Sequence, residues 1–109
     1  MEEIEYETVR ERKRLAYGGA ASLVVTIDKK THDLIGEPLL DFQGVAGVEL
    51  GDGFESDARE AVSDAISEMK REHIADRTVF REQLRLALKN YLRSELGTKP
   101  VIVTTIVEV

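Results

Sequence analysis

The chain has 109 residues, a formal net charge of −6 at pH 7 and no cysteine. This length allows one domain with one hydrophobic core, and a chain of this size buries roughly two-thirds of its unfolded surface. The absence of cysteine excludes disulfides, cysteine zinc sites and thiol nucleophiles, and it suits a reducing, cytoplasmic location. No apolar run approaches the ~20 residues that cross a bilayer, so we expect no membrane span.

The first part of the chain is dominated by charged residues. The segment from Glu2 to Arg14 holds few apolar side chains, and it is predicted to be a linker that ends in a short helical segment. Gly18 and Gly19 follow and interrupt any regular structure. We therefore divide the chain into a lead-in segment, residues 1–18, and one folded domain, residues 19–109.

The first folded element is predicted to be a strand over residues 20–28, because apolar positions recur there with a period of two. One face carries Leu23, Val25 and Ile27, and the other carries Val24 and Thr26. A turn over residues 29–33 leads to a second strand around residues 34–45, which Pro38 interrupts. Because proline cannot donate to a strand ladder, we expect this strand to lie at an edge of the sheet or to begin again at Pro38.

A glycine-rich loop then leads to two predicted helices. The first is predicted to begin at a cap formed by Ser56 or Asp57 and to continue to about Glu72. A connector with His73 leads to the second helix, which Gly97 ends. Each helix carries one apolar stripe at helical spacing. The stripes consist of Ala58, Val62, Ala65, Ile66 and Met69 in the first helix, and of Phe80, Leu84, Ala87, Leu88, Tyr91 and Leu92 in the second.

Residues 101–109 are predicted to form a last strand with two apolar faces. One face carries Val101, Val103 and Val107, and the other carries Ile102 and Ile106 beside Thr104. The element order predicts an α+β fold, with a three-stranded sheet and two helices packed on one face. We place the valine set against the helices, so that Val24, Ile102 and Ile106 form a candidate interface on the uncovered face. The alternative register exchanges the two sets, and the pattern excludes neither.

No catalytic or metal centre is predicted in this chain. It contains two histidines, His32 in a turn and His73 at a helix end, whereas a metal hydrolase site needs three or more converging His or carboxylate ligands. We interpret both histidines as surface or connector residues. The sequence also lacks a nucleophile elbow and a phosphate-binding loop. We therefore expect no catalytic residue, no metal ligand and no cofactor in this chain.

Two bands of charge recur at every fourth residue along the predicted helices. The acidic band of the first helix is Glu60, Asp64, Glu68 and Glu72, and the basic band of the second is Arg77, Arg81, Arg85, Lys89 and Arg93. We interpret both as solvated faces, with some acid–base pairing if the helices lie antiparallel. The alternative is that the basic band contacts phosphates or an acidic partner. The net charge of −6 opposes binding to nucleic acid.

The end of the chain is its most specific passage. It reads Lys99-Pro100-Val101-Ile102-Val103-Thr104-Thr105-Ile106-Val107-Glu108-Val109. This run resembles the closing segment of ribonuclease J, the bacterial metallo-β-lactamase/β-CASP nuclease. Further positions that resemble the C-terminal domain of that family are Arg12, Arg14-Leu15-Ala16 and Gly19 in the lead-in, and Pro38, Leu40, Gly44 and Val45 in the second strand. Thr104 departs from the family where many members have a second proline. Phe42-Gln43 departs where Ser/Thr-Arg is common, so a contact made by that arginine is not expected here.

The resemblance implies the same fold, a three-stranded sheet backed by two helices. It implies a parent enzyme that is a 5′–3′ exoribonuclease and endoribonuclease in mRNA decay and rRNA maturation, with two divalent metals, zinc or manganese. The metal-binding histidines and aspartates of that enzyme lie in a catalytic region that has no counterpart in this chain.

The chain is then expected to be a fragment in which Met1 is an artificial start. Its expected role is that of a non-catalytic accessory domain that supports assembly and the activity of the catalytic region. Its expected partner is its own catalytic region or a second copy of itself, and it is expected to meet RNA through the parent enzyme. The alternatives are a free-standing dimerisation or adaptor module, and a small RNA-binding domain.

Overall fold

The three strands and the two long helices follow one another in the computed structural model as the alternation and punctuation of the sequence predict. The structure describes residues 19–45 and 53–109, so the predicted lead-in, residues 1–18, lies outside the described residues. Strands β1 (Ala20–Ile27), β2 (Leu39–Gln43) and β3 (Val101–Glu108) form one sheet in the order β2-β1-β3. β2 pairs with β1 antiparallel, and β3 pairs with β1 parallel. The predicted α+β fold is confirmed.

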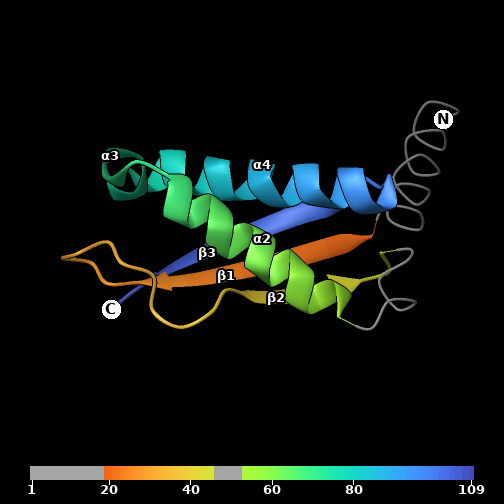
Figure 1. Ribbon diagram of the computed structural model, residues 1–109, viewed down its shortest axis with the longest axis horizontal. Helices are drawn as coiled ribbons and strands as arrows, with labels where there is room; N and C mark the ends of the chain where they lie inside the picture. Colours follow the sequence, from red (N-terminus) through yellow and green to blue (C-terminus); the bar gives the residue numbers. More distant parts are fainter. Residues whose placement is uncertain (1–18, 46–52) are drawn as a thin grey trace, which may run out of the picture.

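Helices α2 (Phe54–Glu68) and α4 (Arg77–Leu96) lie on the same face of this sheet, and the short α3 (Arg71–Ala75) connects them at one end (Figure 1). α4 packs on β3 and on α2, and α2 contacts β2. The sequence did not predict α3. The first helix stops at Glu68 rather than near Glu72, because Met69 and Lys70 have extended backbones with ψ of 144°. This break turns the chain so that Ile74 of α3 reaches the core.

The start of α2 differs from the prediction. Neither Ser56 nor Asp57 caps the helix, because the chain enters it through Gly53, which has a φ of 88°. The first helical residue, Phe54, places its ring 5.8 Å from the ring of Tyr91 in α4. This aromatic contact lies across the interface between the two helices and extends α2 beyond the predicted cap.

Both ends of α4 are set by local signals. The side chain of Asp76 accepts hydrogen bonds from the amides of Thr78 and Val79, at 3.1 and 3.3 Å, and so satisfies two free N–H groups of the first turn. At the other end Gly97 takes a left-handed conformation with a φ of 68°, and its amide donates to the carbonyl of Arg93. The predicted end of this helix at Gly97 is confirmed.

The core lies between the helices and the sheet, and both predicted stripes contribute to it. Its buried side chains are Ala21, Leu23, Val25, Ile27, Leu40, Ala58, Val62, Ile66, Ile74, Phe80, Leu84, Leu88 and Leu92. Met69 and Tyr91, at the margins of the stripes, are partly buried against this cluster. The prediction that the Leu23 face of β1 meets the helices is confirmed.

The predicted face of β3 is wrong. The parallel register pairs Ala21 with Ile102 and Val25 with Ile106, so both isoleucines lie on the helix side and pack against the core. The valine set therefore lies on the opposite face. Both sets are apolar and alternate with the same period, so only the pairing with β1 decides which set meets the helices.

β2 lies at an edge of the sheet, as predicted from Pro38. The strand begins directly after this proline, at Leu39, and it is shorter than predicted. Before it, Leu34 forms only an isolated bridge with Ile27. The proline, which is buried, interrupts the pairing because it has no N–H to donate.

Candidate functional surfaces

The face of the sheet opposite the helices carries exposed apolar side chains beside polar ones, which are Ser22, Thr26, Asp41, Gln43 and Thr105. Its apolar side chains are Val24, Leu39, Val101, Val103 and Val107. Leu39 is 61% exposed and Val103 is 54% exposed, whereas a side chain in a sheet covered on both faces is buried. We call this surface the open face. No helix of residues 53–109 covers it (Figure 1).

Of the three predicted interface residues, only Val24 lies on the open face, where it is partly buried between Leu39 and Thr105 of the neighbouring strands. Ile102 and Ile106 belong to the other face and contact the core. The prediction missed Leu39, and it assigned the exposed valines to the helix side. The position of Leu39 directly after Pro38 indicated that it belongs to an edge strand. The alternation of apolar residues alone did not show on which face of the sheet its side chain lies.

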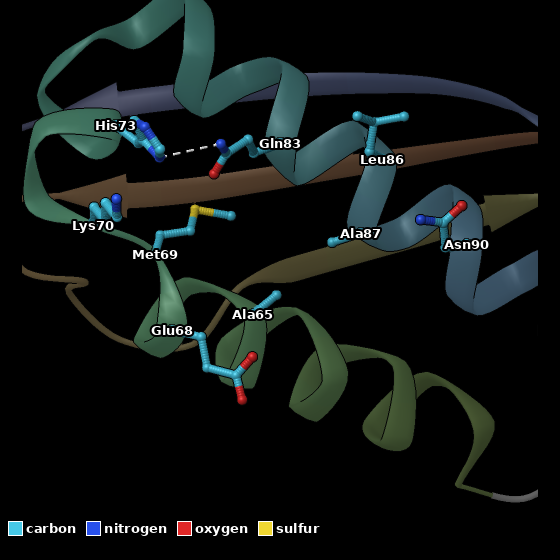
Figure 2. A pocket seen from close by; sticks show the side chains of 9 residues that line it. All are labelled: Ala65, Glu68, Met69, Lys70, His73, Gln83, Leu86, Ala87 and Asn90. Atoms are coloured by element: carbon cyan, nitrogen blue, oxygen red, sulfur yellow. Dashed lines mark hydrogen bonds between the residues drawn. The ribbon is translucent and has the colours of Figure 1, made fainter.

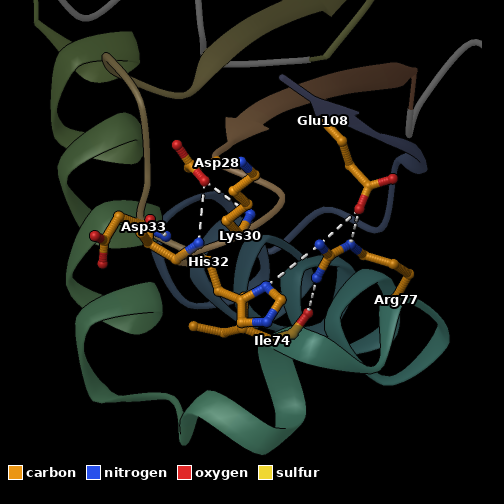
Figure 3. Close-up of polar contacts among 8 residues, drawn as sticks. Asp28, Lys30, His32, Asp33, Ile74, Arg77 and Glu108 are labelled. Carbon is orange, nitrogen blue, oxygen red and sulfur yellow. Dashed lines mark hydrogen bonds and ion pairs between the residues drawn. The ribbon is translucent and has the colours of Figure 1, made fainter.

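The basic band begins with Arg77, which joins α4 to the last strand and to the turn after β1 (Figure 3). Its Nη2 lies 2.6 Å from Oε1 of Glu108 in β3, and its Nη1 donates to the carbonyl of Ile74. Nη2 also lies 3.4 Å from Nδ1 of His32. Arg77 is thus held by three groups, and it serves as a structural contact rather than as a free cation.

The turn that carries His32 is organised by Asp28. Its Oδ1 accepts hydrogen bonds from the amides of Lys30 and Thr31, at 2.7 and 3.0 Å (Figure 3). The bonds from Thr31 and then Lys30 lower the pKa of Asp28, because they stabilise its charged form. His32 has a φ of 64°, an uncommon left-handed conformation for a non-glycine residue. This turn presents the imidazole to Arg77.

Further along the band, Arg85 pairs with Glu82 of the same helix, with Nη2 and Oε1 2.6 Å apart. This contact lowers the pKa of Glu82 and raises that of Arg85. Arg81 and Arg93 are exposed, and Lys89 is partly exposed. None of these three has an ion-pair partner within residues 19–45 and 53–109. Among the described residues, Arg81, Lys89 and Arg93 of the band are therefore positive charges without an ion-pair partner.

No member of the acidic band pairs with the basic band of α4 in the described part of the chain, so the pairing expected for antiparallel helices is not formed there. Glu60 and Asp64 each stand two residues from the buried Val62, about 200° around the helix. Both therefore face solvent, and Glu68 at the end of α2 and Glu72 in α3 are exposed as well. The basic band flanks α4 on the side of β3, as the contact between Arg77 and Glu108 shows.

A shallow groove lies between α2, α3 and α4 (Figure 2). It has a volume of about 460 Å³ and is lined by Ala65, Glu68, Met69, Lys70, His73, Gln83, Leu86, Ala87 and Asn90. Gln83 Nε2 and Nδ1 of His73 are 3.3 Å apart at one end of the groove. The groove shows that this side of α4 faces α2 and α3, so the basic band lies on the other side.

The two histidines lie apart, His32 beside Arg77 and His73 beside Gln83. In the segments that the structure describes, no three His, Cys, Asp or Glu side chains are close enough together to hold a metal ion. None of the described helices is long and apolar enough to cross a bilayer.

Comparison with known proteins identifies the family. A sequence model of the ribonuclease J C-terminal domain matches residues 7–109. The chain belongs to this family. A curated relative, Ribonuclease J2 of Bacillus subtilis (strain 168), is 27% identical over 101 residues, which cover 93% of this chain and 18% of that protein. The chain thus spans less than a fifth of the length of the curated relative that it matches.

The resemblance seen in the closing segment is confirmed, and the fold described above is that of this ribonuclease J C-terminal domain. The domain presents two separate surfaces. One is the open face of the sheet, and the other is the basic band along α4.

Proposed function

We propose that the chain is the non-catalytic C-terminal accessory domain of a ribonuclease J-like enzyme, and that it supports the assembly of that enzyme. The observation that carries this proposal is the open face. Val101, Val103 and Val107 lie in a row on it and are 39–54% exposed, and Leu39 lies across the sheet from them. Exposed apolar side chains gathered on one face in this way usually mark an interface.

The parent enzyme of this proposal is a cytoplasmic 5′–3′ exoribonuclease and endoribonuclease that acts in mRNA decay and rRNA maturation. Its two divalent metals, zinc or manganese, are held by the catalytic region, and this domain contributes no ligand to them. The separation of His32 from His73 supports this division, because each ring contacts a side chain of α4 rather than another metal-ligating group.

The partner of the open face is the catalytic region or a second copy of the domain. Either partner removes the exposed valines from water, which stabilises the complex by roughly 25 cal/mol for each Å² of apolar surface buried. Symmetric pairing of two copies is the commonest arrangement for soluble proteins. The proposal therefore predicts self-association of the isolated domain.

The test is sedimentation of the isolated domain, and of the domain joined to its catalytic region, over a wide concentration range. Val103→Lys/Val107→Lys is expected to abolish association, because the added charges would be buried in the interface without partners. Leu86→Lys is the matched control, since Leu86 and Val107 are both 39% exposed but Leu86 lies on α4, away from the sheet. The proposal is wrong if the isolated domain is monomeric and the joined protein assembles equally well with and without the lysines.

A further inference from the structure

Strand β3 leaves one edge of the sheet open in the part of the chain that the structure describes. The amides of Val101 and Val109 donate to the carbonyls of Gly19 and Ile27, both at 3.0 Å, so the odd-numbered residues direct their main-chain groups toward β1. Main-chain groups alternate sides along a strand. The N–H and C=O groups of Ile102, Thr104 and Ile106 therefore point outward, away from β1.

The two edges of the sheet differ in how well they are protected. β2 has five residues, follows Pro38 and carries the charged Asp41 on its open face. Short strands, proline and charge are the usual means of preventing edge-to-edge pairing. β3 has eight residues, contains no proline, and its first charged side chain is Glu108 at its end. Of these two edges, β3 is thus the one suited to accept another strand.

The basic band lies beside this open edge. Arg77 contacts Glu108 of β3 at the start of α4, and the opposite side of the helix, with Gln83 and Ala87, lines the groove shared with α2 and α3. α4 runs along the β3 side of the sheet over most of its length (Figure 1). Arg81, Lys89 and Arg93 thus extend the positive charge on this side of α4.

We propose that the β3 edge binds an extended, acidic segment of a partner protein, which adds to the sheet as a fourth strand. Its main chain pairs with the outward groups of Ile102, Thr104 and Ile106, as in other cases of strand addition. Its carboxylates, on the helix side, contact Arg81 and Lys89. Its alternate side chains are apolar and extend the open face beside the valines.

The charges favour this partner over a second copy of the domain at the same edge. Two copies joined through their β3 edges form a continuous sheet in which the two α4 helices approach each other with their basic bands facing. Like charges in this arrangement repel. An acidic strand instead neutralises the band. At physiological salt the Debye length is about 8 Å, so charges farther away than this are largely screened. The attraction of the acidic strand to Arg81 and Lys89 therefore outweighs its repulsion by the more distant carboxylates of the chain.

The same features favour a peptide over RNA. A nucleic acid backbone does not pair with the N–H and C=O groups of a strand edge, and single-stranded RNA is held largely by stacking on aromatic rings. In the described segments the aromatic side chains are Phe42, Phe54, Phe80 and Tyr91, and all of them belong to or pack against the core. None is available for stacking beside the basic band.

The experiment uses a synthetic peptide of the same length as β3, in which Glu alternates with Val and Thr. The control peptide has the same composition with its glutamates grouped at one end. Binding is measured by titration with the isolated domain, and amide hydrogen exchange is followed by NMR. The peptide is expected to protect the amides of Ile102 and Ile106 from exchange. The amide of Val103, which faces β1, is expected to be protected with or without peptide.

Two variants test the two parts of the site. Thr104→Pro removes an outward N–H without breaking a bond to β1, and Arg81→Glu/Lys89→Glu reverses the charge. Each is expected to weaken binding of the alternating peptide by roughly tenfold or more, with an unchanged thermal unfolding curve. If Thr104→Pro does not fold, the test of strand pairing is the amide hydrogen exchange of Ile102 and Ile106 in the wild-type domain, measured with and without the peptide.

The proposal is wrong if the alternating and grouped peptides bind equally, since the interaction would then be charge attraction without strand pairing. It is also wrong if peptide binding leaves the amide hydrogen exchange of Ile102 and Ile106 unchanged, or if single-stranded RNA displaces the peptide from the basic band. Self-association that Thr104→Pro abolishes would assign the edge to a second copy instead. Val103→Lys/Val107→Lys distinguishes this outcome from assembly through the open face, because it changes the open face and leaves the main-chain groups of the β3 edge in place.

Discussion

The interior of α4 offers the sharpest test of the fold through Leu84→Ala and Leu88→Ala. Both leucines are fully buried in the middle of the apolar stripe, between the sheet and α2. Each substitution removes three carbons, worth about 0.8 kcal/mol apiece, or about 2.4 kcal/mol in transfer free energy. The cavity that remains adds to this loss, so the expected destabilisation is about 3–4 kcal/mol, within the range observed for core leucines.

The assay is urea unfolding followed by circular dichroism, with Leu86→Ala as the control. Leu86 lies on the same helix but is 39% exposed, so its truncation is expected to cost less than about 1 kcal/mol. A loss of about 3 kcal/mol also lowers the melting temperature of a domain of this size by about 12–24 °C. Equal losses for Leu84→Ala and Leu86→Ala would show that the wrong face of α4 has been assigned to the core.

Three further predictions concern charge and chemistry. Because hydrogen bonds lower the pKa of Asp28 in the folded state, its contribution to stability is complete above the unfolded value of about 3.9 and disappears as the pH falls through the folded pKa. Asp28→Asn is therefore expected to be less stable than wild type near pH 6 and to approach it at lower pH in urea titrations, and a constant difference would contradict this. We also expect that the basic band does not bind single-stranded RNA on its own at low salt; tight wild-type binding that Arg81→Glu/Arg85→Glu abolishes would refute this. Finally, the isolated domain is expected to show no nuclease activity with Mn²⁺ or Zn²⁺, and metal-dependent cleavage lost in His32→Ala or His73→Ala would overturn that expectation.

Local patterns in the sequence were sufficient for the elements and for most of the core. Alternation identified β1, and the fourfold spacing of Phe80, Leu84 and Leu88 identified the buried side of α4. Gly97 marked the end of that helix because its left-handed backbone is readily adopted by glycine. Such signals are local, since they depend on the geometry of a few consecutive residues.

The positions of the candidate surfaces depend on contacts that the local pattern does not encode. The acidic and basic bands were visible as spacings, but spacing places a charge only relative to its own helix. The packing of α4 over β3 decides that the basic band lies beside the open edge, and that the acidic band faces solvent. The interhelical pairing expected from the sequence is therefore not formed in the described part of the chain.

The sequence alone determined that this protein is an α+β domain with an edge strand and two apolar helix stripes, because period and punctuation are properties of neighbouring residues. Only the tertiary structure decided which side of β3 meets the helices. Both sides of that strand are apolar, so burial favours neither, and the parallel pairing of Ala21 with Ile102 settles the choice. That pairing brings the isoleucines into the core and leaves Val101, Val103 and Val107 on the surface.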